Sequence, residues 1–179
     1  MTGTRKPRAQ VQIEPVNPAE FEELAKLASD SFADTFGHTM TDEELRQSLA
    51  ESRSVAYFEK TFSSSTILVA KEADRIVGYV QYGDVKIPEI KDRDDAQELG
   101  RLYVATDHHG QGIGRRLMDT ALADPAMESA AKIYLQVWDQ NYKAIPLYES
   151  CGFKTVGVTY FEVAGRPMQD LIMLREQKP

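Results

Sequence analysis

The residues best suited to do chemistry lie between Val104 and Met118, where three glycines stand at alternate positions: Gly110, Gly112 and Gly114. They follow a run typical of a strand and precede a helical pattern. Because glycine lacks a Cβ atom, the backbone can turn tightly there and approach a ligand closely. The free N–H groups at a helix start converge on one spot, where the helix dipole favours an anion. The segment therefore predicts an anion-binding loop.

Arg115 and Arg116 add positive charge to the first turn of the same helix. Positive charge opposes the helix dipole at that end, and a bound anion would resolve the conflict. The dinucleotide pattern of glycines fails, because Arg115 or Leu117 stands where a third glycine is required, and the Gly-Lys-Ser/Thr of a phosphate-binding loop is missing. Short glycine motifs also leave open a loop that only turns the chain.

The run LGRLYVATDHHGQGIGRRLM resembles the acetyl-CoA-binding motif of the GCN5-related N-acetyltransferases (GNAT superfamily), whose signature is Q/R-x-x-G-x-G/A. Residues 109–114 match it, except that His109 stands at the Gln or Arg position. The resemblance implies that the backbone of residues 110–115 holds the pyrophosphate, and that the edge of strand 102–104 pairs with the pantetheine arm. The cofactor-binding residues that it implies are Leu102, Tyr103, Val104, His109, Gly110, Gln111, Gly112, Ile113, Gly114 and Arg115.

A second block, residues 134–153, is similar to the later motif of the same family, with a strand, Asn, a helix, Tyr and Gly-Phe in order. Asn141 matches the position whose side chain contacts the cofactor, although Asn is also a good helix N-cap. Tyr148 matches the tyrosine usually proposed to protonate the departing CoA thiolate, and the alternative for it is a packing residue. A thiol of pKa ~8.5 leaves readily, so this acid has a modest task.

Glu98 is the predicted general base. A primary amine is mostly protonated at neutral pH, because alkylammonium pKa values lie near ~10.4, so a group must accept its proton. Strand alternation predicts Glu98 on the same face as Leu102 and Val104, along the expected cleft. The alternative is a glutamate that simply faces solvent at a strand end. Backbone N–H groups near Val104 are expected to stabilise the developing oxyanion, and Cys151 is interpreted as a small packing residue.

The elements that must position these residues follow from periodicity and end signals. Helices are expected after the capping boxes at Asn17 and Thr41, after the glycine loop until Pro125, and over 141–150. The expected strands are 11–16, 66–71, 75–82, 97–104, 132–138, 154–163 and 170–175, the last two joined by a Gly165-Arg166-Pro167 turn. This order predicts a mixed α/β sheet. The family resemblance implies a mostly antiparallel central sheet of about seven strands flanked by about four helices.

Length and composition predict one domain over residues 11–179, preceded by a flexible basic tail over 1–10. The net charge is −7, and residues 14–59 carry eleven acidic side chains against three basic ones. This balance disfavours nucleic acid as a partner and favours a cationic ligand, although solvated helix faces would also explain it. The single cysteine, the missing signal segment and the missing long apolar run predict a cytoplasmic protein without a membrane contact.

Metal catalysis is not expected, because the adjacent pair His108 and His109 does not have the spacing of common zinc ligands, and the only other histidine of the sequence is His38. Segments 31–38, 55–62, 98–104 and 170–173 resemble bacterial polyamine N-acetyltransferases of the PaiA kind. That resemblance and the acidic first third imply a di- or polyamine acceptor, with candidate pocket aromatics Phe36, Tyr57 and Tyr160. Acetylation of a protein N-terminus, a lysine or an antibiotic amine stays open, as does a non-catalytic acetyl-CoA sensor. A homodimer is implied by the family only.

Overall fold

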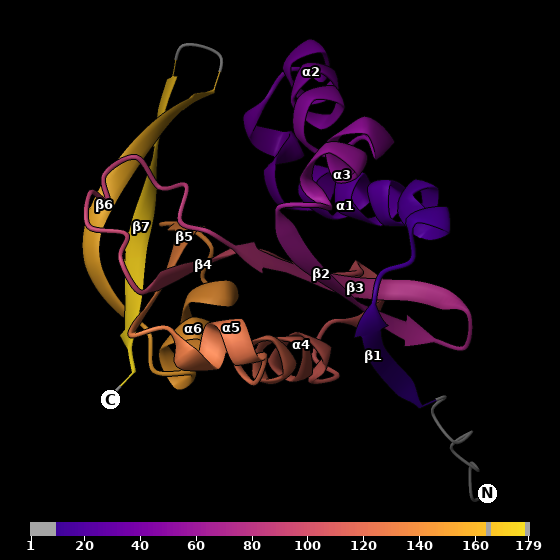
Figure 1. The fold of residues 1–179 in the computed structure, drawn as a ribbon. Helices are drawn as coiled ribbons and strands as arrows, with labels where there is room; N and C mark the ends of the chain where they lie inside the picture. Colours follow the sequence, from indigo (N-terminus) through magenta and orange to yellow (C-terminus); the bar gives the residue numbers. More distant parts are fainter. Residues whose placement is uncertain (1–9, 164–165, 178–179) are drawn as a thin grey trace, which may run out of the picture.

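The computed structural model describes residues 10–163 and 166–177, and its centre is a seven-stranded sheet in the order β1-β2-β3-β4-β5-β7-β6 (Figure 1). Neighbouring strands are antiparallel except β4 and β5, which are parallel. The mostly antiparallel mixed sheet predicted from the sequence is therefore confirmed. The strands are β1 (Val11–Pro15), β2 (Ser65–Glu72), β3 (Arg75–Gly83), β4 (Ala96–Val104), β5 (Lys132–Trp138), β6 (Lys154–Val163) and β7 (Arg166–Glu176).

Helices cover both faces of the sheet: α1, α2 and α3 lie on one side and α4, α5 and α6 on the other (Figure 1). Two apolar clusters match these layers, one joining α1 and α3 to β2 and β3, the other joining α4 to the sheet's opposite face. Within the described residues, no helix has the length and apolarity needed to cross a bilayer. The helices are α1 (Phe21–Phe36), α2 (Asp42–Ser52), α3 (Val55–Thr61), α4 (Ile113–Leu122), α5 (Pro125–Ser129) and α6 (Ala144–Ser150).

The two helices beyond the expected four, α3 and α5, are short and begin at local caps. The Ser54 hydroxyl accepts the Tyr57 N–H at 3.3 Å, and the Asp124 carboxylate accepts the Ala126 N–H at 3.0 Å. Pro125 indeed lies beyond the end of α4, but its fixed φ also suits the first position of a new helix. Sequence periodicity over five to seven residues is too short to reveal such helices.

Other boundaries agree with the end signals or differ by a few residues. Both capping boxes form, at Asn17 with Glu20 and at Thr41 with Glu44. Helix α6 begins at Ala144 rather than at residue 141, because the chain turns before it. Arg166 and Pro167 already belong to β7, not to a turn. Gly165 and residues 1–9 of the predicted tail lie outside the described residues.

The parallel pair β4 and β5 separates soon after it begins. Their register pairs run only over Ala96–Glu98 and Lys132–Tyr134, whereas β3 accompanies β4 up to Val104. Beyond Glu98, β4 therefore has no strand partner on its β5 side within the described part of the chain. Unpaired backbone groups at a strand edge need water or a ligand as partners. The sheet thus contains a wedge that opens toward the end of β4.

A β-bulge interrupts β4 at Gly100. Gln81 of β3 is opposite Arg101, but the next residue, Tyr82, is opposite Leu99, so Gly100 has no counterpart. An extra residue shifts the side-chain alternation by one position. Leu99 and Leu102 consequently pack in the same apolar cluster, although they are three residues apart. This shift decides where Glu98 lies.

Candidate active site

The glycine loop reaches α4 through two residues in the left-handed region. Gly110 has φ 71° and Gly112, the residue that caps α4, has φ 78°. A Cβ atom added at either glycine would meet no protein atom within 4 Å. Glycine is therefore needed at both positions for its left-handed backbone conformation, and not because a side chain would clash with other protein atoms. The space that a side chain would occupy there is open.

The backbone amides of this loop and of the first turn of α4 lack partners within the described structure. The Arg116 N–H is the first to make an i→i−4 bond, to the Gly112 carbonyl at 3.0 Å. The N–H groups of residues 110–115 have no hydrogen-bond partner among the residues that the structure describes, and no side chain caps α4. A run of unpartnered donors at the positive end of a helix can hold a phosphate or diphosphate.

The two arginines of the first turn have partners within the protein. Arg115 donates its Nε–H to Asp119 at 2.8 Å, and Arg116 donates to the Val11 carbonyl at 2.7 Å. The two arginines therefore do not need a bound anion as a partner, because Asp119 on the next turn of α4 holds Arg115 and the β1 backbone holds Arg116. The loop's capacity for an anion comes from its backbone.

His109, which stands where the family motif has Gln or Arg, binds the protein backbone. Its Nε2–H donates to the Val104 carbonyl at 2.8 Å, and its side chain is exposed. This bond ties the loop to the end of β4. His109 can thus position the loop even where it does not itself contact a phosphate.

His108 has a role that sequence reasoning missed. Its ring is buried, with Nδ1 2.7 Å from Asp107 and Nε2 3.1 Å from Glu72 at the end of β2. Carboxylates accept and do not donate, so both ring nitrogens must carry protons for both bonds to form. Burial acts to lower the pKa of His108, but its bonds to Asp107 and Glu72 outweigh that effect and raise the pKa above its usual value.

This charged network anchors the glycine loop to the β2–β3 hairpin. Asp107 is also held by Arg75 at 3.1 Å, at the start of β3, so His108 and Arg75 clamp the same carboxylate. The network lies directly before Gly110. Adjacent Asp and His residues before a glycine loop were the signal in the sequence, but nothing there placed Glu72 beside them.

We expect His108→Gln to lower the free energy of unfolding by about 1.5–3 kcal/mol at pH 6, because a neutral amide lacks the positive charge with which the imidazolium binds both carboxylates. Because the pKa of His108 is higher in the folded than in the unfolded protein, its contribution to stability is complete below about pH 6.5. That contribution declines as the pH rises through the pKa of the folded state. Urea unfolding of both proteins from pH 5.5 to 9 measures it. The stability difference should shrink with rising pH, and a difference independent of pH would contradict this role. Exposed His109→Gln is the matched control.

Glu98 lies on the face of β4 opposite to the one predicted. Because the bulge at Gly100 shifts the alternation, Leu102 and Val104 share the face of Leu99, and Glu98 points to the other. The prediction of a face shared with Leu102 and Val104 is therefore wrong, since it assumed regular alternation. Glu98 instead lies on the side of α3, with Arg101.

The Glu98 carboxylate is held by one oxygen and free at the other. Its Oε2 accepts the Lys86 N–H at 2.6 Å and the Ile87 N–H at 3.2 Å, both in the loop after β3. Its Oε1 has no hydrogen-bond partner among the described residues and lies beside Gly100. Burial raises the pKa of Glu98, and the two amide bonds oppose the rise. A fixed carboxylate with one free oxygen and a raised pKa is suited to accept a proton.

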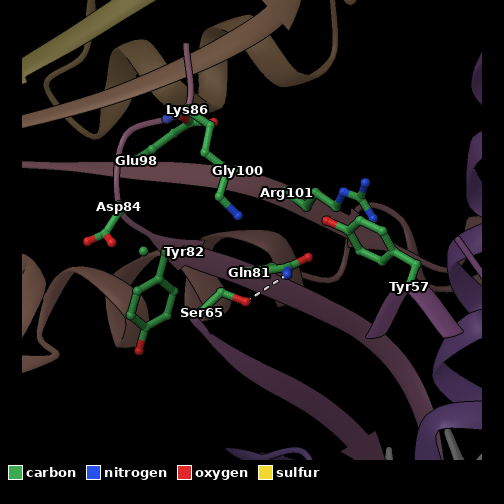
Figure 2. Close-up of a pocket in the computed structure, with 10 residues that line it drawn as sticks. Tyr57, Ser65, Gln81, Tyr82, Asp84, Lys86, Glu98, Gly100 and Arg101 are labelled. Carbon is green, nitrogen blue, oxygen red and sulfur yellow. Dashed lines mark hydrogen bonds between the residues drawn. The ribbon is translucent and has the colours of Figure 1, made fainter. Parts of the chain in front are cut away.

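A cavity of about 170 Å³ lies between the bulge, β3 and α3 (Figure 2). Glu98 and Gly100 line one side and Tyr57 another, with the Arg101 guanidinium 4.2 Å from the centre of the Tyr57 ring. The remaining lining residues are Ser65, Gln81, Tyr82, Gly83, Asp84, Lys86 and Arg101. The cavity would hold a small molecule beside the free Glu98 oxygen.

Tyr148 and Asn141 lie on the other side of the sheet, around α6. Tyr148 is 6% exposed and packs in the cluster with α4. Burial raises the pKa of its phenol far above the usual value, and the nearby Tyr103 and Cys151 add to the rise. The Asn141 side chain accepts the Ala144 N–H at 3.1 Å and so caps the turn into α6. Cys151 is partly buried against the same cluster.

None of the acidic side chains of residues 14–59 lines the cavity. Glu14 and Glu20 pair with Lys71, Glu23 accepts the Ile76 N–H, and Asp34 accepts the Thr106 hydroxyl. Glu20 and Glu23 thus hold the start of α1 to β2 and β3, and Asp34 holds its end to the segment before the glycine loop. Glu14 joins β1 to β2. Among the candidate aromatics, Tyr57 lines the cavity, Phe36 packs on Trp138 at 5.4 Å, and Tyr160 is exposed on β6.

Solved structures of known proteins share this fold. The PaiA N-acetyltransferase of Thermoplasma acidophilum, solved with coenzyme A, has a TM-score of 0.75 at 19% identity, over 94% of this chain and 99% of that one. The yncA protein of Salmonella typhimurium, solved with acetyl-CoA, has a TM-score of 0.69 at 20% identity, over 95% of each chain. At these identities the likeness shows the fold.

Sequence comparison goes further than the fold. An uncharacterized N-acetyltransferase of Mycobacterium bovis is 30% identical over 157 residues, which are 87% of this chain and 96% of the relative. The family model for the acetyltransferase (GNAT) family matches residues 21–153, which include the glycine loop, Glu98 and Tyr148. The chain therefore belongs to the GNAT family of acetyltransferases.

Proposed function

We propose that this protein transfers the acetyl group of acetyl-CoA to a primary amine by direct attack of the amine on the thioester. The observation that carries the proposal is the run of unpartnered amides over residues 110–115, next to the open edge of β4. The donors suit a pyrophosphate, and the wedge between β4 and β5 suits a slender arm that pairs with residues 102–104. Bound acetyl-CoA supplies the activated acetyl group.

Glu98 is proposed as the base that receives the ammonium proton, through its free Oε1. Its raised pKa brings it closer to the amine's own pKa and so makes the transfer less unfavourable. Backbone N–H groups near Val104 are proposed to stabilise negative charge on the carbonyl oxygen. The amine attacks directly, and no covalent attachment to Cys151 is required.

Tyr148 is proposed as a hydrogen-bond donor to the departing sulfur. Its phenol is harder to deprotonate than an ordinary tyrosine, whereas a thiol has a pKa of about 8.5, so full proton transfer to the thiolate would be unfavourable. A hydrogen bond stabilises the thiolate without that transfer. Asn141 is proposed to contact the cofactor with its amide nitrogen, since its oxygen is used by the cap.

For the acceptor, we propose a di- or polyamine. The support is the cavity, whose lining residues Glu98, Asp84 and Gln81 all carry oxygen acceptors suited to a cation. The cations that line it are held elsewhere or exposed: Arg101 donates to the Ser52 carbonyl at 2.6 Å, and Lys86 is exposed. The acidic helices, by contrast, add little support, because none of their acidic side chains lines the cavity.

Calorimetric titration with acetyl-CoA, followed by a free-thiol assay on an acceptor panel, tests the proposal. The panel contains a diamine, a triamine, a lysine peptide, an N-terminal alanine peptide and an aminoglycoside. We expect the diamine and triamine to have the highest kcat/KM. Cofactor binding without turnover of any amine would indicate a sensor, and preference for a peptide would overturn the polyamine acceptor. Absence of acetyl-CoA binding would overturn the proposal as a whole.

A further inference from the structure

Gln81 of β3 presents a buried hydrogen-bond acceptor that has no partner. The residue is 4% exposed, yet it lines the cavity beside Glu98. Its Nε2 donates to the Ser65 hydroxyl at 2.8 Å and to the Thr61 hydroxyl at 3.2 Å. Its Oε1 is buried and makes no hydrogen bond with any described residue. Buried polar atoms are seldom left in this state, so the oxygen needs an explanation.

The orientation of the Gln81 amide follows from the two hydroxyls. Thr61 donates its hydrogen to the Tyr57 carbonyl at 3.0 Å, and Ser65 donates its hydrogen to the Thr61 carbonyl at 2.8 Å. Each hydroxyl has one hydrogen, so both can only accept from Gln81. The amide must therefore turn its NH₂ group toward them. Figure 2 shows this arrangement, with the carbonyl oxygen on the side away from Ser65.

Neither of the cationic side chains that line the cavity, Arg101 and Lys86, donates to Gln81 Oε1. Arg101, opposite Gln81 on β4, donates to the Ser52 carbonyl and stacks on Tyr57, and makes no hydrogen bond to Gln81. Glu98 and Asp84 are acceptors. Gln81, Glu98 and Asp84 all line the space of about 170 Å³, and two of their oxygens, Gln81 Oε1 buried in its wall and Glu98 Oε1, have no partner in the described structure.

We infer that Gln81 is a specificity-determining residue, whose carbonyl oxygen accepts an N–H hydrogen bond from the amine acceptor. The inference rests on the proposed function and deepens it. A primary ammonium has three N–H donors, so two remain after one is given to Glu98, and one of these can donate to Gln81. A quaternary ammonium has none and would leave Oε1 unpaired. Sites that hydrogen-bond a substrate N–H reject analogues that lack it strongly, because their buried polar groups stay unsatisfied.

Gln81→Met tests the inference, because methionine has similar length and no acceptor oxygen. We expect KM for the diamine to rise roughly tenfold to a hundredfold, as for loss of a hydrogen bond to a charged group. The Kd of acetyl-CoA should not change. Wild-type protein should also bind the diamine much more tightly than its bis(trimethylammonium) analogue, measured as a competitive inhibitor, and Gln81→Met should lose most of that preference.

Two further variants separate recognition from folding. Gln97→Met, on neighbouring β4 and outside the cavity lining, is the matched control and should leave the KM of the diamine unchanged. Ser65→Ala removes the 2.8 Å bond that orients the amide and should raise the diamine KM several-fold, so it tests the inference even if Gln81→Met does not fold.

The outcomes distinguish the two proposals. If wild-type protein acetylates amines but Gln81→Met and Ser65→Ala keep the wild-type KM and the wild-type preference for primary ammonium, Gln81 meets only water and the inference is overturned. If wild-type protein acetylates no amine, the proposed function fails first, and the inference fails with it.

Discussion

Glu98→Gln should lower kcat/KM for the amine by roughly a hundredfold to ten-thousandfold, the range that a positioned general base contributes. Glutamine can still accept the Lys86 and Ile87 amide bonds through its oxygen, so the loop after β3 should keep its place. What is lost is the capacity to take a proton. Initial rates with saturating acetyl-CoA measure the change, and calorimetry should give an unaltered Kd for acetyl-CoA.

The pH profile provides the specific test of this role. Wild-type kcat/KM should rise with pH through a pKa above that of an ordinary glutamate, because burial raises the pKa of Glu98 and the carboxylate form is the active one. That limb should vanish in Glu98→Gln. Exposed Glu128→Gln on α5 is the control, and Tyr148→Phe should have a smaller effect because a thiolate leaves readily. An unchanged rate and profile in Glu98→Gln would exclude Glu98 as the base.

Gly112→Val should weaken acetyl-CoA binding by roughly a hundredfold or lose it. A β-branched residue at φ 78° costs about 1–3 kcal/mol in backbone strain, and the loop can avoid that cost only by turning its amides away. Since an added Cβ meets no protein atom within 4 Å, any further loss must come from contact with the ligand. Isothermal titration of acetyl-CoA measures the Kd, and urea unfolding measures the strain.

Two comparison variants separate strain from ligand contact. Gly112→Asn tolerates the left-handed region better than valine, so it keeps the backbone and adds side-chain volume. Gly37→Ala, at φ −55° with an ordinary 3.7 Å contact to Leu45, should leave the Kd unchanged. Wild-type affinity in Gly112→Val would show that the loop does not hold the phosphates.

The sequence predicted those features that depend on local chemistry. The capping boxes, the glycine loop and the two strands β2 and β3 are properties of adjacent residues, and they appear in the structure nearly as expected. The bulge at Gly100 could not be predicted, because it depends on the register between β3 and β4. One extra residue there moved Glu98 to the other face of the strand.

Contacts between distant segments were also beyond sequence reasoning. Glu72 lies 36 positions before His108, and only the folded hairpin brings the two together. The orphan oxygen of Gln81 depends on where the hydrogens of Thr61 and Ser65 go, which requires coordinates. The residue types were enough to predict the family, whereas the hydrogen bonds and pKa shifts of the candidate site could be described only from the structure.

The short pairing of β4 with β5 has a consequence for solubility. An exposed, unpaired strand edge invites another protein molecule to add a strand and so promotes aggregation. Here the free edge lies in the interior of the sheet, and Lys132–Tyr134 occupy the place of a neighbour over Ala96–Glu98. A foreign strand could align only with the few residues that follow, too few for stable intermolecular pairing. Because this free edge of β4 lies inside the sheet, its backbone groups can still bind a ligand, but they are not open to pairing with another protein molecule as those of an outer strand are.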